Sequence, residues 1–78
     1  MARGSSMNKG RLLGSGGSLE QIAKMIKKYY YYKDLPILKE NEPNIWDVYY
    51  PHSSPRAGQK LKSCRVRKFI NRYRFEVL

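Results

Sequence analysis

The sequence predicts a small α+β protein in which an antiparallel β-sheet packs on a C-terminal helix. Three patterns support this fold class: helical apolar spacing after Ser18, a β-branched and aromatic run over residues 45–50, and a second helical pattern over residues 63–73. The first helix is an N-terminal addition to the sheet. Residues 18–78 form the single domain, and residues 1–17 form a flexible basic arm.

The arm is predicted from its composition. Residues 1–17 are rich in Gly, Ser and basic side chains, and Leu12-Leu13 is their only apolar pair. The segment Gly14-Ser15-Gly16-Gly17 has the composition of a flexible linker. We therefore expect a disordered arm whose cations add weak contacts to phosphate.

The first helix begins after Ser18, which has the capping-box spacing with Gln21. Its apolar positions repeat at i, i+3 and i+4, opposite a lysine face, and it must end before Pro36. The run Tyr29–Tyr32 at its end is expected to place two rings on the core and two half exposed, although such rings could also stack on unpaired bases. The apolar positions are Leu19, Ile22, Ala23, Ile26 and Tyr30.

The strongest strand pattern is residues 45–50, preceded by a short apolar piece at 37–38 and a loop at 40–44. Alternation places Trp46, Val48 and Tyr50 on the core and leaves Asp47 and Tyr49 outward. Residues 51–58 form a loop, and residues 59–62 return as the second strand of a hairpin.

The second helix is predicted to begin at Ser63. Val66, Phe69, Ile70 and Tyr73 follow helical spacing and are assigned to the core, with basic side chains on the opposite face. The alternation of residues 73, 75 and 77 leaves open that the tail straightens into a strand.

Charge indicates the class of partner. Sixteen Lys and Arg residues against six acids give a net charge of +10. Such a surface attracts polyanions, because neutralising phosphates releases counterions. The alternatives are a merely solvated face and an anionic membrane. Eight cations and no acid lie between residues 56 and 74: Arg56, Lys60, Lys62, Arg65, Arg67, Lys68, Arg72 and Arg74.

The sequence offers no pattern for catalysis, a metal or a cofactor. His52 is the only histidine and Cys64 the only cysteine, so neither has a partner at metal-ligand spacing. No apolar run approaches the roughly 18 residues of a membrane span. We expect a non-enzymatic protein without a cofactor, in a reducing compartment.

A series of motifs between residues 46 and 70 resembles the methyl-CpG-binding domain family. It comprises Asp47-Val48-Tyr49-Tyr50, a Ser-Pro loop ending at Gly58, Gln59-Lys60-Leu61-Lys62-Ser63, and then Val66 with Lys68-Phe69-Ile70. The family's counterparts read D-V-Y-Y, S-P, G-K-K-L-R-S and E-V-x-x-Y-L.

The resemblance implies a twisted sheet on one helix, with the hairpin edge in the DNA major groove. It makes Asp47 the acid that positions an arginine finger, Tyr49 the tyrosine at the methylated cytosine, and Ser63 the helix cap. Lys62 stands at the second arginine finger, and residues 35–39 contain no first finger. Because lysine lacks the planar fork that meets guanine O6 and N7, we expect a divergent member without strict methyl-CpG selectivity.

The predicted partner is double-stranded DNA, with RNA as the alternative, and further protein partners in a chromatin or ribonucleoprotein assembly. The expected location is the nucleus. The competing hypotheses are a structural subunit of a ribosome or mitochondrial complex, and a small antitoxin-type or phage-type regulator. The predicted contact surface comprises Lys39, Asp47, Tyr49, Lys60, Lys62, Ser63, Arg65 and Lys68.

Overall fold

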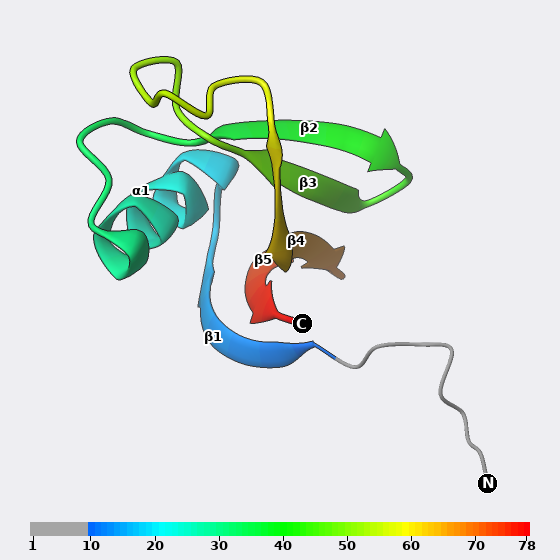
Figure 1. The fold of residues 1–78 in the computed structure, drawn as a ribbon. Helices are drawn as coiled ribbons and strands as arrows, with labels where there is room; N and C mark the ends of the chain where they lie inside the picture. Colours follow the sequence, from blue (N-terminus) through cyan, green and yellow to red (C-terminus); the bar gives the residue numbers. More distant parts are fainter. Residues whose placement is uncertain (1–9) are drawn as a thin grey trace, which may run out of the picture.

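The computed structural model describes residues 10–78, which form five strands and one helix (Figure 1). The bounds are β1 Arg11–Gly16, α1 Leu19–Tyr30, β2 Ile37–Glu42, β3 Ile45–Tyr49, β4 Lys60–Phe69 and β5 Arg72–Val77.

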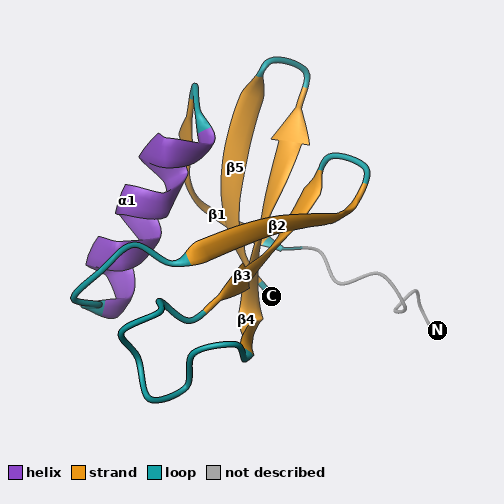
Figure 2. Cartoon of the chain, turned by 90° about the horizontal axis from the view of Figure 1, so that it is seen from above, coloured by secondary structure: helices purple, strands orange, loops and turns teal. Residues whose placement is uncertain are grey.

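The five strands make one antiparallel sheet in the order β1-β5-β4-β3-β2. Strands β2 to β5 follow one another as a meander, and β1 pairs with β5, so the first and last strands are neighbours. Helix α1 connects β1 to β2 across one face of the sheet (Figure 2). The other face has no helix over it within residues 10–78, and we call it the open face.

The predicted N-terminal helix is confirmed at its start. Ser18 is the N-cap, and its hydroxyl accepts a hydrogen bond from the Gln21 amide at 3.2 Å. The Gln21 side chain accepts from the Gly17 amide at 2.7 Å, which satisfies a second free donor. The helix ends at Tyr30, six residues before Pro36, because Tyr31 adopts a left-handed cap with φ of 61°.

The tyrosine run at the end of the helix divides into two core rings and two outer rings as expected, but Tyr31 is almost fully exposed rather than half exposed. Tyr30 and Tyr32 pack against the core with rings stacked at 5.4 Å, whereas Tyr29 and Tyr31 are 48% and 92% exposed. The ring centroids of Tyr32 and Tyr50 lie 6.0 Å apart. Burial raises the pKa of Tyr32 to about 12.

The predicted flexible arm is wrong for residues 11–16, which form β1 along β5. Two glycines in this strand allow helix α1 to pack closely against it. A Cβ on Gly14 would lie 2.9 Å from Met25 Sδ, and one on Gly16 would lie 2.9 Å from Gln21 Oε1. The helix can therefore lie directly on this strand. Residues 1–9 of the predicted arm lie outside the described residues.

The predicted face assignment of β3 is confirmed. Trp46 and Val48 are buried, Tyr50 packs against the same core, and Asp47 and Tyr49 point to the open face. Residues 40–42, predicted as part of a loop, continue β2 instead, and the hairpin to β3 turns at residues 43–44.

The fold-class prediction is wrong, because no C-terminal helix exists for the sheet to pack on. Residues 60–69 form β4 and residues 72–77 form β5, and α1 is the one helix within residues 10–78. Helix α1 is therefore part of the main core, and the prediction that it is an extra element added to a sheet and a C-terminal helix is wrong. Helical spacing grouped Val66 and Tyr73 with Phe69 and Ile70, but only the first two reach the core.

Two-residue alternation describes this region better. Cys64 and Val66 on β4 and Phe75 on β5 are buried, and the residues that alternate with them point to the open face: Arg65, Arg67, Arg74 and Glu76. Burial raises the pKa of the Cys64 thiol, and the side chain is part of the core. The buried core cluster comprises Ile22, Ile26, Trp46, Val48, Leu61, Cys64, Val66 and Phe75.

Candidate nucleic-acid interface

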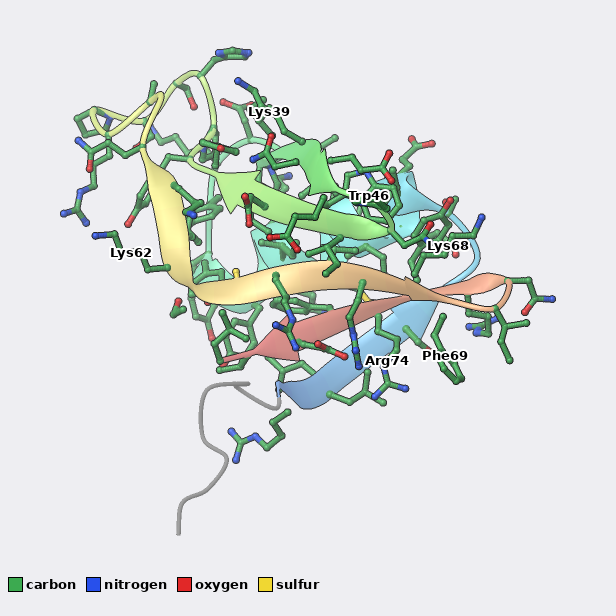
Figure 3. The ribbon with its side chains drawn as sticks, turned by 90° about the vertical axis from the view of Figure 1, so that its right-hand side faces the viewer. Lys39, Trp46, Lys62, Lys68, Phe69 and Arg74 are labelled. Atoms are coloured by element: carbon green, nitrogen blue, oxygen red, sulfur yellow. The ribbon has the colours of Figure 1, made fainter. Side chains whose placement is uncertain are left out.

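The open face of the sheet carries a set of basic side chains from three strands, β2, β4 and β5. Residues paired across antiparallel strands point to the same side, and this register assigns the set. Figure 3 views the molecule from the side opposite α1 and shows Arg74 among the side chains in front of the sheet. The cations on this face are Lys39, Lys60, Arg65, Arg67, Arg72 and Arg74.

Three of these arginines surround one buried carboxylate, Glu76, which is 0% exposed. Arg65 Nε donates to its Oε1 at 2.9 Å, and Arg74 Nε donates to its Oε2 at 3.1 Å. Arg67 donates to the same Oε2 from Nε and Nη2, at 3.2 and 3.0 Å. We call these four residues the arginine cluster.

The cluster fixes its carboxylate as an anion. Burial alone would raise the pKa of Glu76, but hydrogen bonds from Arg65, Arg74 and Arg67 outweigh burial and hold that pKa below its ordinary value. Gly10 lies next to the carboxylate, since a Cβ there would be 2.8 Å from Glu76 Oε1.

The guanidinium groups remain partly accessible. The side chains of Arg67 and Arg74 are 42% and 32% exposed, although Glu76 beneath them is fully covered. Arg74 contacts Glu76 through Nε, and within residues 10–78 its two Nη nitrogens have no hydrogen-bond partner. The buried carboxylate therefore positions arginine forks whose outer edges face solvent.

A second polar group lies at the β2–β3 side of the open face. Asn41 Nδ2 donates to Asp47 Oδ2 at 2.7 Å and to the Tyr49 hydroxyl at 3.1 Å. Lys60 Nζ lies 3.9 Å from Asp47 Oδ2, and Lys39 Nζ lies 5.0 Å from the Tyr49 ring centroid. Four predicted site residues are thus brought together here: Lys39, Asp47, Tyr49 and Lys60.

The other predicted site residues are divided. Arg65 belongs to the arginine cluster, whereas Lys68 points to the helix side, with its Nζ 5.7 Å from the Tyr73 ring centroid. Lys62 lies at the opposite end of the sheet from Lys68 (Figure 3). Ser63 hydrogen-bonds the Tyr30 hydroxyl at 3.0 Å and lies in a strand, so its predicted role as a helix cap is wrong.

Lys62 and Ser63 instead line a hollow between β4 and a group of three tyrosines. Tyr30, Tyr32 and Tyr50 supply its aromatic side. The Arg56 guanidinium also lines it, lies 5.3 Å from the Tyr50 ring centroid and donates to the Tyr50 hydroxyl at 3.1 Å. This hollow is separate from the arginine cluster.

Arg67, Arg74 and Glu76 were not predicted to lie together. Alternation of residues 73, 75 and 77 was the available signal, because it places 72, 74 and 76 on the other side of a strand. The exposed residues Phe69 and Ile70 were missed for the same reason, since helical spacing assigned them to the core. They form the tip of the β4–β5 hairpin.

Cations also occur on the outer surface of α1. Lys24, Lys27 and Lys28 line a shallow hollow together with Tyr31 and Leu35. These lysines lie on one helix, and none of them contacts a buried carboxylate within the described chain. The outer surface of α1 therefore carries cations without the buried carboxylate that orders the arginines of the open face.

Residues 10–78 contain no group of three or more His, Cys, Asp or Glu side chains placed to hold a metal ion. Within the same range, no helix has the length and apolar composition needed to cross a bilayer.

The resemblance to methyl-CpG-binding domains implies a helix that begins at Ser63, but residues 63–69 lie in strand β4. Its expected fold is therefore not found here, and membership of that family stays a prediction. Comparisons of the chain with models of protein families, with curated proteins and with solved structures gave no match.

Proposed function

We propose that this protein binds nucleic acid, with double-stranded DNA as the partner, through the open face of its sheet. One observation carries the proposal: six cations from three strands share the face that α1 leaves uncovered, and Glu76 holds three of them in place. The nuclear location and chromatin partners expected from the sequence depend on this binding and are part of the same proposal.

Preorganised arginines suit a phosphate backbone. The guanidinium group is a planar fork that can donate two parallel hydrogen bonds to one phosphate. A free arginine loses side-chain entropy on binding, on the order of 1 kcal/mol for each immobilised side chain. Arg67 and Arg74 are already held through Nε, so less entropy remains to be lost.

The shape of the face favours a duplex over a single strand. Beyond Arg67 and Tyr73, where pairing with β3 and β1 ends, the β4–β5 hairpin is a two-stranded antiparallel ribbon, and such ribbons enter the major or minor groove of DNA. On the open face, Tyr49 has Lys39 over its ring, so it is not a free stacking platform for an unpaired base.

The test compares two triple variants with equal loss of charge. The first, Lys39→Gln/Lys60→Gln/Arg72→Gln, removes open-face cations outside the arginine cluster. The second, Lys24→Gln/Lys27→Gln/Lys28→Gln, removes the helix lysines. Binding to a matched 20-base-pair DNA duplex and an RNA duplex is measured by fluorescence anisotropy over a salt series.

The open-face variant is expected to bind DNA about tenfold or more weakly, with a salt slope smaller by about 2 to 3, because each phosphate contact contributes roughly 0.9. The helix variant should keep the slope of the unaltered protein. Equal losses in both variants would mean that net charge alone governs binding, and would contradict the proposal. Tighter binding to the RNA duplex would assign the face to RNA.

A further inference from the structure

The tip of the β4–β5 hairpin exposes two large apolar side chains. Phe69 is 59% and Ile70 is 78% exposed. The tip also extends past both neighbouring strands, because β3 pairs with β4 only as far as Arg67 and β1 pairs with β5 only as far as Tyr73. Figure 2 shows this hairpin projecting from the sheet at the top of the view.

The tip is built from an unfavourable residue. The hairpin turns through Ile70 and Asn71, and Ile70 has φ of 60°. Two-residue hairpin turns require Gly, Asn or Asp at such a position, and a β-branched residue there is strained. Ile70 is neither buried nor suited to the backbone conformation of the turn, so it contributes little to folding. Its apolar side chain therefore points to a role in contacting another molecule.

The surroundings of the tip are cationic. Arg72 pairs with Phe69 across the hairpin, and the Arg67–Arg74 pair follows two ladder positions away, roughly 7 Å at the usual rise per residue. Leu12, Phe69, Ile70 and Arg74 line one shallow hollow on the open face. An apolar wedge therefore stands at the end of the face that carries the arginine cluster.

We infer that this tip is a wedge that inserts Phe69 and Ile70 between adjacent base pairs and kinks the duplex, while Arg72 and Arg74 contact the flanking phosphates. The inference rests on the proposed function and deepens it. A base-pair step offers apolar stacking surfaces between two anionic strands, which matches an apolar tip between arginines. Side chains such as Phe and Ile unstack base steps in this way and bend DNA.

The main test uses two substitutions that relieve the same kind of backbone strain. Ile70→Gly removes the wedge side chain and suits the positive φ of the turn. Tyr31→Gly does the same at the C-cap of α1, where φ is 61° and the side chain is 92% exposed. Neither substitution is expected to lower the melting temperature of the free protein.

Unstacking is followed by the fluorescence of 2-aminopurine placed at successive steps of a 20-base-pair duplex, and bending by energy transfer between its ends. The unaltered protein and Tyr31→Gly should raise the 2-aminopurine signal and shorten the end-to-end distance. Ile70→Gly should lose most of both responses and bind about tenfold more weakly. Phe69→Ser should do the same with the turn unchanged.

Salt-dependent binding with no unstacking in the unaltered protein would overturn the wedge and leave the proposed function standing. No binding to any duplex would overturn both. Equal responses from Ile70→Gly and the unaltered protein would exclude the tip from the contact. If sedimentation showed instead that Ile70→Gly abolishes a dimer while DNA bending is unchanged, the tip would belong to a contact between two copies of the chain, and the wedge would be wrong.

Discussion

At the scale of single residues, Glu76 has the largest expected effect on stability. It is a fully buried carboxylate that accepts hydrogen bonds from three arginines. Removing one partner of such a buried ion pair strongly destabilises the fold, because the remaining charges are left without compensation. Glu76 also joins β5 to β4 through its bonds to Arg65 and Arg67, so it links the stability of the sheet to the geometry of the proposed interface.

Glu76→Gln is expected to lower the free energy of unfolding by about 3 kcal/mol at pH 7, measured by urea denaturation. Glu20→Gln is the control, because Glu20 forms an exposed ion pair with Lys24 at 3.8 Å and should change stability by less than about 0.5 kcal/mol. Equal effects from the two substitutions would contradict a structural role for the arginine cluster.

The same carboxylate gives the protein an acid-sensitive stability. The pKa of Glu76 is lower in the folded state than in an unfolded chain, where it is roughly 4.3. Its contribution is therefore complete above that unfolded value and is lost as pH falls through the folded value. Between pH 6 and pH 2, Glu76→Gln should lose less stability than the unaltered protein, and parallel pH curves would contradict this assignment.

At the scale of elements, β1 shows how composition can mislead. Gly14 and Gly16 have the composition of a linker, but their missing side chains let α1 pack onto the strand. The start of α1 could be predicted because a capping box involves residues only a few positions apart in the sequence. The faces of β3 could be predicted because alternation is also visible within a few residues. The pairing of β1 with β5 joins residues about 60 positions apart, and no short-range pattern reports it.

The prediction of a helix in the C-terminal region was wrong for a related reason. Val66 and Tyr73 fit both a helical and a two-residue period, and in a short segment spacing alone cannot separate the two. What favours strands is Glu76 lying directly across from Arg65, a contact that only the folded sheet creates. The turn at Ile70-Asn71 also contains no Gly or Pro, so neither of the strongest local turn signals marks the break between β4 and β5.

Adjacent glycines test the packing of β1 on α1. A Cβ on Gly16 would lie 2.9 Å from Gln21 Oε1 and 3.2 Å from its Cβ, whereas the nearest atom to a Cβ on Gly17 is 3.8 Å away. Gly16→Ala is therefore expected to destabilise the protein by about 1 to 3 kcal/mol through overpacking. Gly17→Ala should be nearly neutral. Thermal melts compare the two, and similar melting temperatures would indicate that residues 14–17 behave as a linker.

At the scale of the whole molecule, cations lie on both sides of a small body. The open face and the outer surface of α1 are separated by one sheet and one helix, and the chain carries a net charge of +10. Mutual repulsion among these charges opposes compaction, and salt screens it because the Debye length is about 10 Å at 0.1 M. The buried bonds of Glu76 are screened much less than exposed charges are.

Salt should therefore act in opposite directions on folding and on binding. Between 0.02 and 0.3 M NaCl, the melting temperature of the free protein is expected to rise by several degrees, on the order of 1 kcal/mol. Over the same range, the extra stabilisation given by a DNA duplex should shrink, because binding to the folded state weakens as counterions accumulate. Thermal melts with and without duplex measure both quantities on one sample series. A melting temperature that falls with salt in the free protein would show that exposed pairs such as Lys60–Asp47, rather than charge repulsion, dominate its electrostatics.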